Sequence, residues 1–210
     1  PIMIQGAMWG ASNAIQTAIL GHMTLNAEAA YSISSTIFLL LKVAAVGACT
    51  AASIIIGKQI GSGKKTELKE TVVTLQLLFM GVGVVLALLL LAIREPLLSV
   101  YRISDETYRL ASAFILIQSV VICAMSYQMP TNSGIIRGGG EARYGMILDF
   151  ISIWIIVLPI SFLAAFVWHF SPIVVVICLN ADQVFKCIPA AIYANSYRWV
   201  HHLVREQPAT

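Results

Sequence analysis

The chain has 210 residues, of which 59% are apolar and only 11% are charged. Soluble globular domains carry about 25% charged residues, so this composition excludes a protein whose whole surface lies in water. The formal net charge is only +3, so the positions of the basic residues say more than their sum. Because the chain starts at Pro1 and no basic segment precedes the first apolar run, we expect no signal peptide and interpret the start as a cut within a longer protein.

Six apolar stretches, each long enough to cross a hydrocarbon core of roughly 30 Å as a helix, follow one another along the chain. They predict transmembrane helices at residues 2–20, 27–56, 67–93, 107–135, 144–168 and 172–196. Glycine, proline and charged residues separate them, and we expect a short interfacial helix around Leu97–Tyr101, after Arg94-Glu95-Pro96. The predicted fold is an all-α integral membrane bundle, with residues 1–210 as one domain and 197–210 as a cytoplasmic tail in which Trp199 is an interfacial anchor.

Basic residues are distributed unequally between the two sides of this bundle. One side collects eight: Lys58, Lys64, Lys65, Lys69, Arg137, Arg143, Arg198 and Arg205. The other side collects three: Arg94, Arg102 and Arg109. Because basic residues are in excess in cytoplasmic loops, both ends of the chain are predicted to be cytoplasmic.

Prolines and small residues mark irregular or close-packed places within the helices. Pro130, Pro159 and Pro189 each remove a backbone donor, which fits either a bundle that bends around a cavity or static irregularities of packing. The pairs Gly6/Gly10 and Gly134/Gly138 have the GxxxG spacing that lets helices approach closely. We expect both pairs to lie at helix–helix contacts.

Polar side chains cluster in the first and fourth predicted helices. Such groups face other helices or a wet cavity, because an unpaired polar group in lipid costs several kcal/mol. Methionines at 125 and 129 flank the cluster and suit a surface that fits varied ligands. The candidate substrate-binding residues are Asn13, Gln16, Gln118, Tyr127, Gln128 and Asn132. The alternative is hydrogen bonding between helices.

Four ionisable residues lie within the predicted spans: Lys42, Asp149, Asp182 and Lys186. Charges inside a membrane are costly and mark functional sites. At about 1.5 Å per residue, Asp149 and Lys186 have similar depths and can pair, while Asp182 precedes Lys186 by one helical turn and can pair with it instead. The four are candidates for ion coupling, or for a structural ion cluster.

Motifs of other functions are incomplete. In the glycine-rich segment 57–65, Lys58 and Lys65 stand where a phosphate-binding loop needs glycine and Ser or Thr. The four cysteines lie in apolar stretches without the spacing of metal ligands. No carboxylate pair is set up for acid–base chemistry. We therefore expect no enzyme, no metal, no cofactor other than a coupling ion, and no nucleic-acid partner.

Three segments resemble the multidrug and toxic-compound extrusion (MATE) family. Residues 134–143, GIIRGGGEAR, resemble its RGxGD-type cytoplasmic turn, with Glu141 where aspartate is usual. Residues 51–63, AASIIIGKQIGSG, resemble the glycine turn after the eighth helix, with Ser62 in place of alanine. Residues 180–189, NADQVFKCIP, followed by 198–200, RWV, are similar to the last helix of bacterial members.

The resemblance covers the whole chain as helices seven to twelve of a twelve-helix protein. It implies a multi-pass protein of the plasma (inner) membrane that exports organic cations and other drugs by antiport with sodium or protons. Its partners would be the lipid bilayer, an N-terminal six-helix half and small-molecule drugs. The alternatives are a lipid-linked oligosaccharide flippase of the same superfamily and a non-transporting membrane interaction module. Such flippases line their cavity with more cationic residues, whereas Lys42 is the only candidate for a cationic cavity residue here.

Two positions depart from the family pattern. Some sodium-coupled members carry a glutamate and an aspartate where this chain has Trp9 and Ser126. The usual cation site of the second half is then absent. Coupling would rest on an acidic residue of the first half, or on Asp149 and Asp182.

Overall fold

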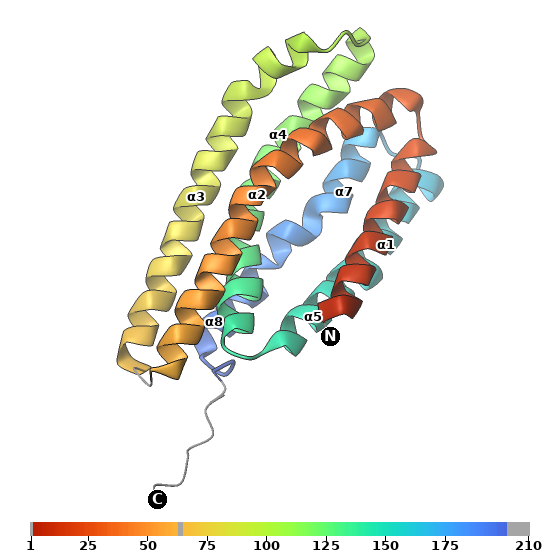
Figure 1. Ribbon diagram of the computed structural model, residues 1–210. Helices are drawn as coiled ribbons and strands as arrows, with labels where there is room; N and C mark the ends of the chain where they lie inside the picture. The colour runs from red at the N-terminus through yellow and green to blue at the C-terminus, as the bar shows by residue number, and fades with distance from the viewer. Residues whose placement is uncertain (1, 63–64, 201–210) are drawn as a thin grey trace, which may run out of the picture.

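The computed structural model describes residues 2–62 and 65–200, which form an antiparallel bundle of long helices (Figure 1). The first four helices are α1 (Ile2–Gly21), α2 (Leu25–Gly61), α3 (Lys65–Val100) and α4 (Asp105–Met129). The fifth predicted span is built from α5 (Ala142–Phe150), α6 (Leu158–Phe162) and two π-helical segments, η2 (Ile151–Val157) and η3 (Leu163–Val167). The last span comprises α7 (Pro172–Phe185) and α8 (Cys187–Ser196).

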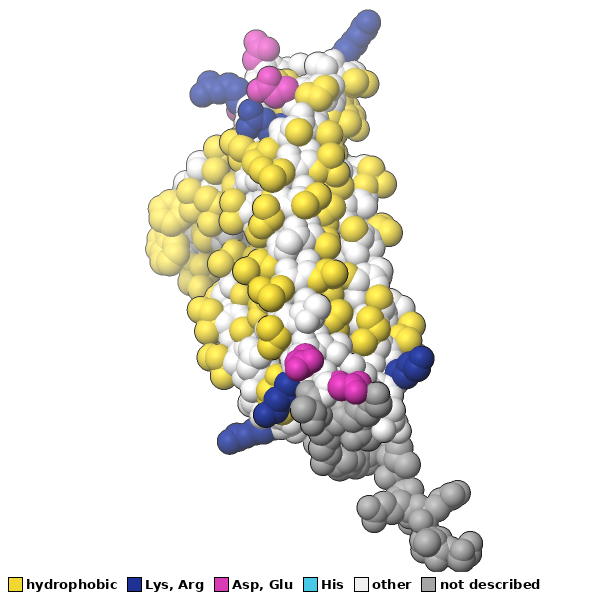
Figure 2. Space-filling view, turned by 90° about the vertical axis from the view of Figure 1, so that its left-hand side faces the viewer, with side chains coloured by type: hydrophobic (Ala, Val, Ile, Leu, Met, Phe, Trp, Pro, Cys, Tyr) yellow, Lys and Arg dark blue, Asp and Glu magenta, His cyan; other side chains and the backbone are white. Residues whose placement is uncertain are grey.

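The fourth helix is the centre of the bundle. With the π-helical segment η1 (Pro130–Ile136) it forms one continuous rod that packs on α2, α3 and α7. Half of the residues in its most apolar part are buried, against 17% in the corresponding parts of α2 and α3. The face drawn in Figure 2 is apolar over its middle, with charged side chains gathered at the two ends. This distribution fits a bundle embedded in lipid.

Five stretches of the described chain are long and apolar enough to cross a membrane: residues 25–61, 67–100, 105–136, 142–167 and 172–196. The predicted first span, α1, is helical over its 20 residues but is not among these five, because Asn13 and Gln16 lower its hydropathy. It packs inside the same bundle, against α2, α5, α6 and α7. The contacts, rather than its own composition, place α1 with the membrane helices.

The prediction that a helix ends at Arg94-Glu95-Pro96 and that a separate interfacial helix follows was wrong. Helix α3 continues through Pro96 to Val100. Proline permits this when the helix bends at the carbonyl four residues earlier, and the end of α3 curves toward the start of α4 (Figure 1). Leu98 is fully buried in the main core, so packing holds the last turns in place.

The three prolines within the spans each coincide with an irregularity of the backbone, as the sequence indicated. The π-helical segment η1 starts at Pro130, and η2 ends two residues before Pro159. Pro189 has no N–H to donate to the carbonyl of Phe185, the residue at which α7 ends. Lys186 occupies the resulting break between α7 and α8.

Only one of the two GxxxG pairs makes a helix contact. A Cβ placed on Gly134 would lie 2.9 Å from the Cβ of Ala52, and one placed on Gly138 would lie 2.9 Å from the Cα of Ser53, so this pair lets η1 and the following turn lie directly on α2. The prediction for Gly6 and Gly10 was wrong, because no atom lies within 4 Å of either Cβ position. In this chain that face of α1 has no helix against it.

The prediction that Trp199 extends the last helix into a polar tail was also wrong, because α8 ends at Ser196. Tyr197 adopts a left-handed conformation with φ of 54° and turns the chain back after α8. The Trp199 side chain is then fully buried, and its Nε1 donates to the carbonyl of Ala194 at 2.7 Å. A side chain at Gly139 would overlap the Trp199 ring, so the glycine turn after η1 is shaped to receive this residue.

The helix order sets a test of topology. The end of α2 and the start of α5 lie at one end of the bundle, and the start of α7 lies at the other (Figure 1). Ser62 caps the end of α2, Glu141 the start of α5 and Ser171 the start of α7. With the native cysteines replaced, a single cysteine at Ser62 or Glu141 is expected to react with an impermeant thiol reagent only from the cytoplasm, and one at Ser171 only from outside. Reaction of cysteines at Ser62 and Ser171 from the same side would contradict this arrangement of spans.

Candidate functional site

A cavity of about 510 Å³ opens between α1, α2, α4, η1, α5, η2 and α7. Its walls combine aromatic, sulfur-containing and polar side chains. The lining residues are Gly6, Met8, Trp9, Lys42, Val46, Cys49, Thr50, Met125, Gln128, Met129, Asn132, Ser133, Arg137, Asp149, Ile153, Trp154, Gln183 and Lys186. Three of the backbone irregularities, η1, η2 and the break at Lys186, border this space.

Two carboxylates from different helices meet the ammonium group of Lys186 at the edge of the cavity. The Lys186 Nζ lies 2.9 Å from Asp149 Oδ1 and 2.8 Å from Asp182 Oδ2. The sequence left open which carboxylate pairs with Lys186, and the structure shows both. The side chains of Lys186 and Asp182 are only 3% and 5% exposed, whereas that of Asp149 is 25% exposed and faces the cavity. We call these three residues the ion cluster.

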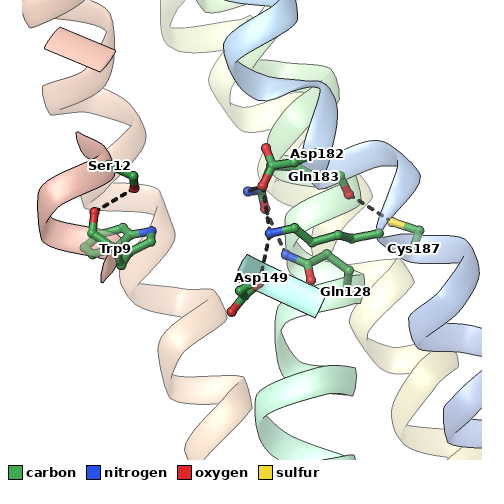
Figure 3. A network of polar contacts seen from close by, with 8 residues as sticks. Trp9, Ser12, Gln128, Asp149, Asp182, Gln183 and Cys187 are labelled. Atoms are coloured by element: carbon green, nitrogen blue, oxygen red, sulfur yellow. Dashed lines mark hydrogen bonds and ion pairs between the residues drawn. The ribbon is translucent and has the colours of Figure 1, made fainter. Parts of the chain in front are cut away.

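Two glutamines extend the ion cluster toward α4. Gln183 Nε2 donates to Asp182 Oδ2 at 2.8 Å, and Gln128 Nε2 donates to Gln183 Oε1, also at 2.8 Å. Figure 3 shows these side chains converging from α4, α5 and α7. The polar groups therefore form a connected chain rather than isolated contacts, and the Asp182 carboxylate is held by a glutamine as well as by the lysine.

Among the residues that the structure describes, Lys42 contacts an aromatic ring rather than a carboxylate. Its Nζ lies 3.9 Å from the centre of the Trp9 ring, a distance at which an ammonium is attracted to the face of an aromatic ring. Lys42 is close enough to Asp182 to be attracted by its charge. Within the part of the chain that the structure describes, the two side chains form no ion pair. Trp9 faces the ion cluster across the cavity (Figure 3).

The structure brings together about half of the sequence-predicted site. Gln128, Asn132, Lys42, Asp149 and Lys186 line the cavity, and Asp182 lies directly behind Lys186. The remaining candidates do not line it: Asn13, Gln16, Gln118 and Tyr127.

Helix rotation explains these exclusions. Gln118 is buried and donates to Ser34 Oγ at 3.5 Å, and Tyr127 points to the other side of α4, where its hydroxyl donates to Gln76 Oε1 at 3.4 Å. For these two, the alternative of hydrogen bonding between helices describes the structure.

Several cavity residues were not predicted as site residues. Arg137 was assigned to the cytoplasmic turn, and Trp9 was noted only because it replaces an acidic residue of the resembling family. Trp154 lines the cavity with its Nε1 buried and without a hydrogen-bond partner, and the buried Asn132 Oδ1 also has none. These unpaired groups leave one donor and one acceptor to interact with water or a ligand. Their orientation depends on helix packing, which residue spacing alone does not reveal.

The arrangement is that of a membrane bundle with a cavity of apolar walls and a few polar groups, and the comparisons with known proteins give its family. The sequence profile of the MatE family matches residues 1–163, which is most of the chain. The chain belongs to the MatE family. No curated protein matches it significantly.

A solved structure shares this fold. The crystal structure of the Vibrio cholerae MATE transporter VcmN in its bent form superposes with a TM-score of 0.79 at 18% sequence identity. The match covers 92% of this chain and 44% of that transporter, so the chain spans less than half the length of VcmN. The likeness confirms the predicted all-α fold of a bundle of membrane helices.

The ion cluster sets an order of stabilities. Lys186→Met leaves two carboxylates without their ammonium, so we expect it to lower the free energy of unfolding most, by about 3–5 kcal/mol. Asp182→Asn should cost less, because Asp149 still pairs with the lysine. Asp149→Asn should cost least, because its side chain is partly exposed. Thermal unfolding of the purified protein in detergent measures this order, and equal stability of all three variants would contradict it.

Proposed function

We propose that the chain is one half of a secondary active transporter that exports organic cations and other amphipathic drugs by antiport with sodium or protons. The observation that carries this proposal is the cavity of about 510 Å³. Its size is typical of small-molecule sites, and such sites combine apolar walls with a few placed polar groups. Trp9 and Trp154 offer flat apolar faces, and methionines 8, 125 and 129 offer adaptable ones.

The second half of the site would come from a first six-helix bundle. The proposed pathway lies between the two bundles, as in transporters built from repeats. The backbone irregularities at η1, η2 and Lys186 border the cavity, and such places bend more easily than regular helix. They support alternating access in which the walls reshape around the bound drug. We place this protein in the plasma membrane, with both ends of the chain in the cytoplasm.

The flippase of the same superfamily remains the second candidate, and one observation favours it. The sequence offered Lys42 as the only cationic cavity residue, but Arg137 and Lys186 also line the cavity, against Asp149 as the single carboxylate among the lining residues. Lys186 is paired with both carboxylates, so the ion cluster as a whole carries one negative charge. Lys42 and Arg137 are left to attract an anionic group such as a lipid-linked phosphate.

The polar wall gives a test of drug recognition. Asn132 and Gln128 both line the cavity; Asn132 Oδ1 has no hydrogen-bond partner, and Gln128 donates to Gln183. We therefore expect Gln128→Ala and Asn132→Ala to change the relative export of different drugs. One hydrogen bond of about 1 kcal/mol corresponds to roughly fivefold in affinity. Efflux assays with a panel of dyes measure the change.

Gln118→Ala is the matched control for this test. It removes a buried glutamine of the same helix that lies outside the cavity, so it should lower stability without changing the drug profile. If the Gln128→Ala and Asn132→Ala proteins reach the membrane in normal amounts and export the same drugs in the same proportions as Gln118→Ala, then Gln128 and Asn132 take no part in drug recognition.

Lys42 separates the two candidate functions. Its ammonium covers the Trp9 face that an organic cation would use, so Lys42→Met should uncover this face. A cation–π contact of about 0.5–2 kcal/mol corresponds to roughly a 2- to 30-fold gain in affinity for cationic drugs. Binding titrations with a hydrophobic cation and with a lipid-linked phosphate measure the effect. Weaker binding of the phosphate, with no gain for the cation, would favour the flippase.

A further inference from the structure

Lys186 occupies the place at which a bound metal cation would lie. Its Nζ touches one oxygen of Asp149 on α5 and one of Asp182 on α7, at 2.9 and 2.8 Å. Hard cations in proteins are held by carboxylate and amide oxygens from several elements. Here two carboxylate oxygens from two helices hold an ammonium that is part of the chain. The lysine side chain is 3% exposed, so this is a buried ion pair and not a transient one at the surface.

The Asp182 carboxylate is also held by a contact that does not involve the lysine. Gln183 donates to Asp182 and is itself held by Gln128. On the neighbouring wall, the Oδ1 of the buried Asn132 has no hydrogen-bond partner and lies against α5, where a Cβ at Gly145 would be 3.1 Å from it. Gly145 precedes Asp149 by one turn of α5, so both positions face the same side. The Asp182 carboxylate would therefore stay in place without the lysine, and an unpaired amide oxygen faces the same side of α5.

The four ionisable residues of the span interiors balance in charge without an added ion. The four ionisable residues of the span interiors comprise two carboxylates, Asp149 and Asp182, and two ammonium groups, Lys42 and Lys186. An additional cation next to Lys186 would be repelled by it, and repulsion between like charges is strong in a poorly solvated site. The region therefore favours the resident ammonium over an exchangeable ion.

We propose that Lys186 is a tethered counter-cation: it occupies, as part of the chain, the position that an exchangeable coupling ion would take between Asp149 and Asp182. The ion cluster then stays paired through the whole transport cycle, and the coupling ion binds elsewhere in the transporter. The statement about coupling rests on the proposed antiport function, whereas the occupancy of the site by lysine does not.

Removal of the ammonium is the direct test. In the complete protein in detergent, Lys186→Met should open a site for an exchangeable cation. Its melting temperature should rise by a few degrees when sodium chloride replaces choline chloride at equal ionic strength, or when the pH is lowered so that the carboxylates take up a proton. The wild type should not show this additional response. Lys69→Met is the matched control, because Lys69 also lies over an aromatic ring, 5.6 Å from the centre of Tyr197, but does not line the cavity, and it should gain nothing.

Two further variants fix the interpretation. The double variant Lys186→Met with Asp149→Asn should lose the gained response, because one of the two carboxylate ligands is gone. A Lys186→Met protein that responds to sodium and to pH like the wild type would overturn the proposal. If Lys186→Met does not fold, Asp149→Asn decides. Any sodium response of the wild type should persist in it, and loss of that response would show that the cluster binds the ion despite the lysine.

These measurements use thermal stability, so they do not depend on transport. A protein that carries no drug but whose Lys186→Met variant gains a cation response would disprove the proposed function and leave the tethered counter-cation intact. A protein that shows normal antiport, but whose Lys186→Met variant gains no cation response, would support the proposed function and disprove the tethered counter-cation.

Discussion

The bridge from Lys186 to two carboxylates is the interaction on which the interior of this bundle depends. A charged group in the apolar interior of a membrane protein is tolerated only when it is paired. The lysine side chain is almost completely buried, and its partners come from α5 and α7. The bridge therefore fixes the relative positions of these helices at the depth of the cavity, and Gln128 and Gln183 extend the constraint to α4.

The position of the bridge follows from the backbone. Pro189 cannot bond to the carbonyl of Phe185, the helix is interrupted at Lys186, and the side chain at this break is the buried lysine of the ion cluster. Similar weak points at Pro130 and before Pro159 border the same cavity. The part of the bundle that can bend is thus the part that contacts a ligand, which links the local structure to the proposed alternating access.

The sequence predicted the features that depend on local pattern, and the structure supplied those that depend on rotation and packing. Hydropathy gave the spans, and the rise per residue placed Asp149, Asp182 and Lys186 at compatible depths. The sequence did not show that Tyr127 and Gln118 turn away from the cavity. Residues of one helix can line the cavity or contact another helix, and which they do depends on how the helix is rotated. The burial of Trp199 depends on a left-handed turn at Tyr197 that no glycine signals.

The central claim is that the cavity beside the ion cluster is the drug pathway, and a native thiol tests it. Cys49 lines the cavity, whereas the other three cysteines do not. In a protein that retains Cys49 alone, the rate of its reaction with a small hydrophilic thiol reagent would be measured with and without a hydrophobic organic cation such as tetraphenylphosphonium. Our account predicts that Cys49 reacts and that the cation slows the reaction in a concentration-dependent way. An unreactive Cys49, or a rate that the cation leaves unchanged, would contradict it.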